Sequence, residues 1–240
     1  MKPAAARTEP ISWIIATRNE HKVEEIRAIL GSDFRYLTLK DFPNAPAVIE
    51  DAPDFTGNAT KKAVQLANWI ASNADSFLDQ PGERWVLADD SGLEVDALNG
   101  APGVHSARFA VLDGTRTNTG NSPDSANNAK LLRLLANVPL EKRAARFRCV
   151  IAVTPVLSES PRDSKVCYSD EAELRTELFD GTCEGHIAFA PSGSGGFGYD
   201  PLFIPRGHKQ SFGELGEEVK NRLSHRAQAL QKLRTWLQKR

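Results

Sequence analysis

Apolar residues in the N-terminal part of the chain alternate between the spacing of buried strands and the spacing of helices. Residues 12–16 form a short apolar run of the kind found in buried strands, and apolar positions between 23 and 30 recur with helical spacing. Gly31 is placed to end that helix, because glycine is favoured just beyond a helix C-terminus. A second helical pattern covers 58–71, and a second strand-like run at 85–88 leads directly into a polar segment. This part of the chain therefore predicts strand, turn, helix, helix and strand.

The middle of the chain predicts one more helix and one more strand. Ser122 is expected as the N-cap of a helix with Pro123 in its first position, and leucines continue its apolar face to residue 135. Apolar and polar residues then alternate over 147–153, which is typical of a strand. Residues 155–180 are polar and irregular, so we expect a hairpin with a surface insertion there.

The C-terminal part predicts a short strand, a glycine-rich loop and a final helix. The strand is expected at 187–190, and the helix at about 224–238 with its apolar residues facing the core. Strands and helices alternate early in the chain and hairpins come late, so we predict an α/β fold with a mixed β-sheet flanked by helices. We expect one domain over 11–240, preceded by a flexible tail at 1–10.

The overall composition argues against several classes of protein. The chain of 240 residues has 30 basic and 31 acidic side chains, and this balance lacks the positive field that polymeric nucleic acid requires. No apolar stretch reaches the roughly 18 residues of a membrane-spanning helix. Three cysteines without metal-type spacing are expected to be reduced thiols of a cytoplasmic protein. Because the chain lacks a broad positive field, phosphate binding would depend on a few cations placed in one site.

The predicted turn after the first strand carries the first candidate binding residues, Thr17, Asn19 and Lys22. N–H groups at the start of a helix have no partner in the helix and attract anions, and a lysine adds a mobile positive charge suited to phosphate. An ordinary capped helix with a solvated lysine explains the same residues. On this turn alone, the ordinary helix is the preferred explanation.

Asp89 and Asp90 follow the second strand-like run, so one of the two carboxylates is expected to point into the structure. Burying a carboxylate is costly unless it is compensated, and a bound cation such as Mg²⁺ is a common compensation. A turn in which the aspartates cap backbone N–H groups is an equally good explanation. Glu50 lies in an acidic segment and could supply a second carboxylate to the metal, although a solvated loop charge is favoured by this signal alone.

The loop at 193–198 matches the pattern G-x-G-x-x-G, but we reject a dinucleotide site there. That motif needs a helix directly after it, and the proline-containing segment 199–205 does not start one readily. The loop instead offers Phe197 to stack on a base and Asp200 to accept a hydrogen bond from a base N–H. The alternative is a structural turn with Phe197 in the core.

Lys220, Ser224, His225 and Arg226 form a basic, hydrogen-bonding group around the start of the last helix. Ser224 is a suitable N-cap, and the basic side chains can donate to a carbonyl oxygen such as the 6-keto group of a purine. A basic helix face in solvent explains the same residues, and it is favoured when they are taken alone.

Five segments, in this order along the chain, resemble the inosine triphosphate pyrophosphatase family, which removes non-standard purine nucleotides. They are 15–25, 88–103, 106–108, 195–203 and 224–226. The resemblance implies an enzyme that uses Mg²⁺ to hydrolyse ITP, dITP and XTP to the monophosphate and pyrophosphate. It also implies an elongated two-lobed fold with a substrate cleft between the lobes, and a homodimer.

The resemblance further implies a role for each candidate residue. Glu50 and Asp90 would hold Mg²⁺, and Asp90 would also orient or deprotonate the attacking water, with Lys62 as a second catalytic residue near the triphosphate. The triphosphate and sugar would be bound by Thr17, Asn19, Lys22 and Ser91, and the base by Phe197, Gly198, Tyr199, Asp200, Lys220, His225 and Arg226.

The chain departs from the family pattern at a few positions. Gly57 stands where the family usually carries glutamate, which removes an acidic side chain near the metal, and His105 replaces the usual tyrosine. The polar stretch 155–180 is also longer than is typical. Two alternatives stay open: a nucleotide-binding sensor that no longer hydrolyses, and a pyrophosphatase for pyrimidine or methylated nucleotides.

Overall fold

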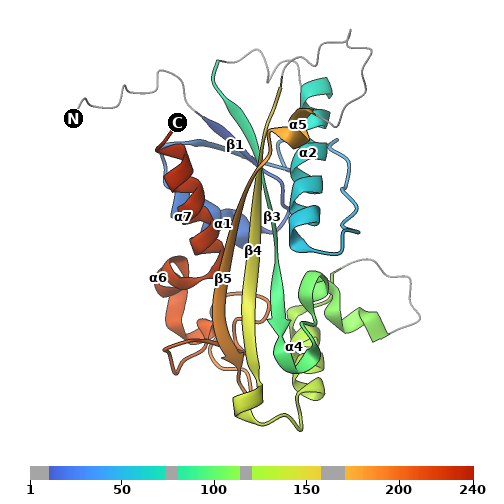
Figure 1. The fold of residues 1–240 in the computed structure, drawn as a ribbon, viewed down its shortest axis with the longest axis vertical. Coiled ribbons are helices and arrows are strands. Elements are labelled where there is room, and N and C mark those ends of the chain that lie inside the picture. The colour runs from blue at the N-terminus through green and yellow to red at the C-terminus, as the bar shows by residue number, and fades with distance from the viewer. Residues whose placement is uncertain (1–10, 74–80, 114–120, 158–170) are drawn as a thin grey trace, which may run out of the picture. The chain divides into compact units, whose positions relative to one another are not determined.

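The structure, a computed structural model, describes residues 11–73, 81–113, 121–157 and 171–240 (Figure 1). The tail predicted at 1–10 lies outside the described residues. The strands are β1 (Ser12–Ile15), β2 (Arg35–Thr38), β3 (Arg84–Val95), β4 (Ala144–Pro155), β5 (Glu177–Ile187) and β6 (Phe203–Pro205). The helices are α1 (Glu20–Leu30), α2 (Phe55–Asn73), α4 (Asp124–Leu134), α5 (Glu171–Leu174), α6 (Phe212–Leu223) and α7 (His225–Leu237), with 3-10 segments at Asp96–Leu98, Gly103–Asp113 and Leu140–Lys142.

The strands form a six-stranded sheet in the order β2-β1-β3-β4-β5-β6. β1 pairs in parallel with both β2 and β3, whereas β5 and β6 are antiparallel. The predicted α/β fold, a mixed sheet flanked by helices, is therefore confirmed. Within the described part of the chain, no helix combines the length and the apolar character that crossing a membrane requires.

The chain divides into two compact units. The first contains the described residues of Met1–Ala52, Thr56–Asp89 and Ile151–Leu178, and the second contains those of Pro53–Phe55, Asp90–Val150 and Phe179–Arg240. The boundary in β3 falls between Asp89 and Asp90, so two adjacent aspartates belong to different units. The substrate cleft expected between two lobes stays a prediction.

In the first unit, β1 has a parallel neighbour on each side and is buried along its whole length. A continuously apolar sequence is typical of such a strand, because both of its faces are covered. The register pairs Ile15 of β1 with Leu87 of β3. Thr17, which follows β1, is therefore level with Asp89 in β3.

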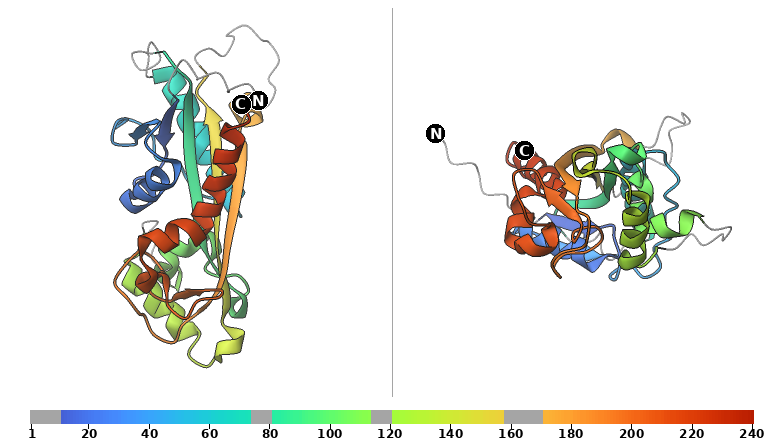
Figure 2. Two further views of the ribbon diagram at one scale, coloured as in Figure 1. Left: turned by 90° about the vertical axis from the view of Figure 1, so that its left-hand side faces the viewer. Right: turned by 90° about the horizontal axis from the view of Figure 1, so that it is seen from below.

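In the second unit, the core lies against β3, β4 and β5 and includes side chains from α4 and α6. The rings of Phe147 in β4 and Phe203 in β6 are 4.6 Å apart between centroids. Helices α6 and α7 follow one another directly, and both views of this unit show α7 beside β5 (Figures 1 and 2). Gly181 makes this approach possible, because a Cβ atom at that position would lie 2.0 Å from the carbonyl oxygen of His225.

Replacing Gly181 with alanine is expected to lower the free energy of unfolding by about 1–3 kcal/mol, because the added methyl group forces β5 and α7 apart. Urea unfolding followed by circular dichroism measures the change. Thr182→Ala is the matched control, since the next residue in a strand points to the other face. Equal losses in the two variants would contradict the close backbone contact.

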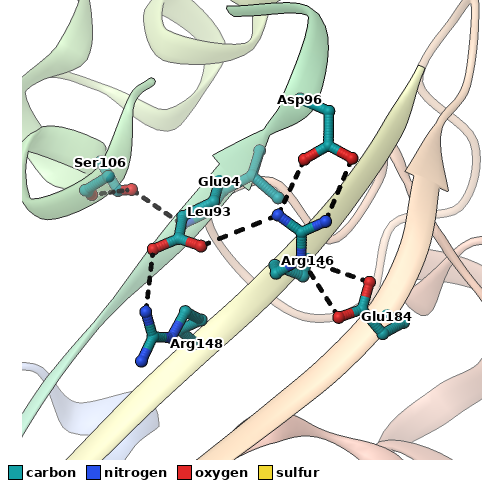
Figure 3. Close-up of polar contacts among 8 residues, drawn as sticks. Leu93, Glu94, Asp96, Ser106, Arg146, Arg148 and Glu184 are labelled. Carbon is teal, nitrogen blue, oxygen red and sulfur yellow. Dashed lines mark hydrogen bonds and ion pairs between the residues drawn. The ribbon is translucent and has the colours of Figure 1, made fainter. Parts of the chain in front are cut away.

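An ion-pair network joins β3, β4 and β5 of the second unit on the sheet face that carries Arg146 (Figure 3). The Nη1 and Nη2 atoms of Arg146 donate to Asp96 at 2.8 and 3.1 Å, and its Nε atom donates to Glu184 at 3.1 Å. Arg148 donates to Glu94 at 3.4 Å. The bidentate bond with Asp96 is the main cause that raises the pKa of Arg146. The arginines of this face are thus matched by carboxylates.

Two of the three cysteines, Cys149 and Cys183, lie in the described part of the chain and are buried free thiols. Burial is the main cause that raises the pKa of Cys183 to about 12. This thiol is therefore protonated and unreactive at neutral pH. Cys167 lies outside the described residues.

Two of the predicted boundaries are wrong near the candidate site. β3 continues through Asp89 and Asp90 to Val95, so the aspartates lie within a strand and the turn explanation is wrong. Helix α4 begins at Asp124, because the backbone of Pro123 is still extended, with ψ at 141°. Pro123 is therefore the N-cap, and the predicted cap by Ser122 is wrong.

The predicted strand at 187–190 is also wrong. β5 ends at Ile187, and the N–H of Ala188 donates instead to the carbonyl oxygen of Leu202 at 2.8 Å. Most of β5 lies just before the predicted strand. β4 and β5 are neighbours in the sheet, and their connection contains α5, while residues 158–170 of the expected insertion lie outside the described part.

Candidate functional site

The turn between β1 and α1 is an N-cap with a mostly buried lysine. The side chain of Asn19 accepts from the N–H of Lys22 at 3.2 Å, and the hydroxyl of Thr17 accepts from the N–H of Asn19 at 3.2 Å. The ammonium group of Lys22 forms an ion pair with Asp89, where the two side chains are 17% and 0% exposed. The capped helix is confirmed, but the solvated lysine of the ordinary explanation is wrong.

A second lysine, Lys62 of α2, lies in the same unit and contacts the same strand. Its Nζ atom donates to the backbone carbonyl of Asp89 at 2.8 Å and is 3.3 Å from a carboxylate oxygen of Glu50. Asp89 is therefore bound by one lysine at its side chain and by another at its backbone. This group in the first unit supplies two cations and two carboxylates, which is chemistry suited to a phosphate chain with a metal ion.

Asp89 and Asp90 are both buried, although successive residues of a strand point to opposite faces. Lys22 compensates the charge of Asp89. A buried pair of this kind is costly to break, because removing one partner leaves a buried charge. Asp89 was recognised only as a neighbour of Asp90, and its role in holding Lys22 was not predicted.

In the second unit, the candidate base-binding residues converge on a buried ion pair. Asp200 accepts from the Nζ atom of Lys220 at 2.6 Å and from the N–H of Phe197 at 2.8 Å. The Asp200 and Lys220 side chains are 3% and 4% exposed. Lys220 also lies 4.3 Å from the centroid of the half-buried Phe197 ring, which is within the range of a cation–π interaction. The ring therefore lies against a fixed, positively charged group.

The start of α7 contributes further donors to the second unit. Ser224 is the N-cap, and its hydroxyl accepts from the N–H of Ala227 at 3.1 Å, as predicted. His225 stacks on Phe147 with the ring centroids 4.8 Å apart. Arg226 is 1% exposed and donates to the hydroxyl of Ser91 at 3.1 Å. The alternative of a basic helix face in solvent is therefore wrong.

Gly198 and Tyr199, both candidate binding residues, make contacts within the protein. The N–H of Gly198 donates to Asp124 at 2.6 Å, and its carbonyl oxygen accepts from Asn128 at 3.0 Å. Tyr199 is buried, and its hydroxyl donates to the carbonyl oxygen of Ser106 at 2.9 Å. Burial is the main cause that raises the pKa of Tyr199 above its usual range. Neither Asp124 nor Asn128 was predicted.

The oxygen ligands present are compatible with a magnesium ion. Within the described ranges, no three or more His, Cys, Asp or Glu side chains form a metal-binding group. Mg²⁺ is commonly held by one or two carboxylates, with waters and substrate phosphates completing its coordination. Glu50 and Asp90 are donors of that type, and Gly57, in the first turn of α2, adds no side-chain ligand.

Comparisons with known proteins identify the family. The chain is 40% identical over 226 residues to the dITP/XTP pyrophosphatase of Halalkalibacterium halodurans, an alignment that covers 94% of this chain and 98% of the relative. It is 43% identical over 220 residues to the enzyme of the same name from Desulforamulus reducens, covering 91% and 92% of the two chains.

Solved structures agree with these relatives. A HAM1 protein from Coxiella burnetii has a TM-score of 0.72 and 32% identity, covering 96% of this chain and 100% of the other. The Ham1 protein of Staphylococcus aureus has a TM-score of 0.70 and 32% identity, covering 95% and 98%. Because a model of the Ham1 family matches residues 13–236, which is nearly the whole sequence, the chain belongs to the Ham1 family.

Proposed function

We propose that the chain is a nucleoside triphosphate pyrophosphatase that hydrolyses non-standard purine nucleotides, namely ITP, dITP and XTP, to the monophosphate and pyrophosphate. The observation that carries this proposal is the pair of lysines, Lys22 and Lys62, bound to Asp89 directly before the buried Asp90. The relatives named dITP/XTP pyrophosphatase support the same reaction.

The residues of the first unit and Asp90 perform the chemistry in this proposal. Glu50 and Asp90 would hold Mg²⁺, and the bound ion would neutralise charge on the phosphates. Lys22 and Lys62 neutralise further charge on the triphosphate, and the α1 N-terminal turn with Thr17 and Asn19 offers hydrogen-bond donors to phosphate oxygens. Asp90 also orients the attacking water and accepts its proton. Positioning and charge neutralisation are sufficient, since phosphoryl transfer needs no covalent intermediate.

The residues of the second unit recognise the base and sugar in this proposal. Phe197 stacks on the purine, and Lys220, His225 and Arg226 supply donors for the 6-keto oxygen, while Asp200 keeps Lys220 in place. Adenine presents an amino group where hypoxanthine and xanthine present this oxygen. With adenine the donors would be left unpaired, so adenine nucleotides would be disfavoured by orders of magnitude. Ser91, which accepts from Arg226, binds the sugar or a phosphate. Tyr199 and Gly198 support the loop that carries Phe197.

The remaining parts of the proposal concern the setting in which the enzyme works. We propose a cytoplasmic homodimer that binds neither polymeric nucleic acid nor a membrane. The net charge of −1 supports the first of these exclusions. Light scattering after gel filtration measures the oligomeric state.

Pyrophosphate release from a panel of nucleotides tests the function. We expect rapid release from ITP, dITP and XTP with Mg²⁺, at least about 100-fold slower release from ATP, and loss of all release on chelation. GTP and a pyrimidine triphosphate complete the panel. Release chiefly from the pyrimidine nucleotide would support the alternative substrate class. Nucleotide binding without any release would support the sensor suggested by Gly57.

A further inference from the structure

Gly198, next to Phe197, is held by helix α4 at both of its backbone polar groups. A carboxylate oxygen of Asp124 accepts from its N–H at 2.6 Å, and the side-chain amide of Asn128 donates to its carbonyl oxygen at 3.0 Å. Asp124 and Asn128 are four residues apart, so they share one face of α4. Gly198 has a positive φ of 64°, a conformation that few other residues adopt. The chain therefore turns at the residue to which α4 is hydrogen-bonded.

Helix α4 is itself anchored within the second unit. The buried side chain of Asn127 accepts from the N–H of Ala110 at 2.8 Å and donates to the carbonyl oxygen of Ala107 at 3.3 Å. Leu131, one turn further on, is fully buried in the core. The helix is therefore a rigid support, and a group bonded to its first turn is held accurately.

The other side of Phe197 is held by a separate set of bonds. Its N–H donates to the carboxylate of Asp200 at 2.8 Å, and its carbonyl oxygen accepts from the N–H of Asp200 at 3.2 Å. Tyr199 adds its buried hydrogen bond to Ser106. The peptide that joins Phe197 to Gly198 is held at its carbonyl oxygen by the N–H of Asp200 and at its N–H by the carboxylate of Asp124.

We propose that Asp124 and Asn128 are positioning residues for base recognition: by clamping Gly198 they set the plane in which the Phe197 ring meets the purine. The identity of the base rests on the proposed function, whereas the clamp itself rests only on the contacts of Gly198. The bond to Asp124 involves an ionised acceptor, so it is the stronger of the two. Losing the clamp leaves the phosphate-binding residues of the first unit unchanged.

The test combines hydrogen exchange with ligand binding in the full-length protein. Asp124→Ala and Asn128→Ala remove one bond each, Asp124→Asn keeps an acceptor oxygen, and Ser125→Ala is the control on the same helix turn. Mass spectrometry measures amide exchange in the segment 195–200, and calorimetry measures the Kd of inosine monophosphate and of inorganic tripolyphosphate. Thermal unfolding checks that each variant is folded.

We expect faster exchange and about tenfold weaker binding of inosine monophosphate in Asp124→Ala, with tripolyphosphate binding unchanged and most of the loss restored in Asp124→Asn. The KM for ITP should rise with little change in kcat. Unchanged exchange in both alanine variants, or faster exchange with unchanged binding of inosine monophosphate, would overturn the proposal. If the wild-type protein hydrolyses no nucleotide, the proposed function fails. Amide exchange and the binding of inosine monophosphate still test whether Asp124 and Asn128 position Phe197.

Discussion

Asp90→Asn is expected to lower turnover of ITP by on the order of 10³-fold, which corresponds to about 4 kcal/mol of transition-state stabilisation. The amide has nearly the same shape as the carboxylate, but it binds Mg²⁺ poorly and cannot accept a proton from water. Because Asp90 is buried, the substitution also changes the contacts of this carboxylate, so the stability of the variant is followed beside its turnover. Steady-state pyrophosphate release and thermal unfolding measure the two effects.

Asp96→Asn is the matched control for that substitution. Asp96 belongs to the same unit, but it binds Arg146 in the ion-pair network and has no proposed part in the reaction. Its substitution should leave turnover within about twofold of the wild-type value. Turnover by Asp90→Asn at the wild-type rate would exclude Asp90 as a catalytic residue.

Lys220→Met is expected to lower the free energy of unfolding by about 3–5 kcal/mol, because it leaves the carboxylate of Asp200 buried without its cation. The same variant should bind inosine monophosphate weakly, since Lys220 both faces the Phe197 ring and is a proposed donor to the base. Urea unfolding and calorimetry measure these changes.

The ion pair of Arg222 and Glu218 on the same helix provides the control. Its atoms are 3.8 Å apart and its side chains are 67% and 90% exposed, so Arg222→Met should cost less than about 1 kcal/mol. Adding Asp200→Asn to Lys220→Met should recover most of the lost stability, because the unpaired charge is then removed. Equal costs for Lys220→Met and Arg222→Met would contradict a buried, stabilising pair.

Local sequence signals predicted those elements whose ends carry their own hydrogen-bonding residues. Helix α1 ends at Gly31 and α7 is capped by Ser224, as predicted, and the capped start expected for α1 is made by Asn19. Helix α6 was missed although its capping box, Ser211 with Glu214, is visible in the sequence.

Strand β5 is harder to recognise in the sequence than these helices. Glycine occupies positions where an apolar side chain would reveal the alternation of buried and exposed residues. Phe179, Gly181, Cys183 and Ile187 are its buried residues. At Gly181 the backbone of α7 fills the space of a side chain. Only the tertiary packing shows why a glycine stands there.

The candidate site was predicted as a set of residues, but its contacts were not. Lys62 and the carbonyl of Asp89 are 27 positions apart, and Arg226 and Ser91 are 135 apart. Pairings over such distances in the sequence depend on the fold and leave no local pattern. For the same reason the basic residues around the start of α7 were expected in solvent. Lys220 and Arg226 are in fact buried, by elements distant in the sequence.

The composition of the loop at 193–198 suggests a flexible linker, yet Gly193 and Gly196, although exposed, leave no room for a side chain. A Cβ atom at Gly193 would lie 2.2 Å from the backbone of Gly213, and one at Gly196 would lie 2.2 Å from the carboxylate of Asp200. Both residues also have positive φ angles, of 79° and 73°. For protein engineering, this loop is therefore among the least tolerant segments of the chain, and libraries that aim to alter nucleotide preference should vary the residues around it and keep its glycines.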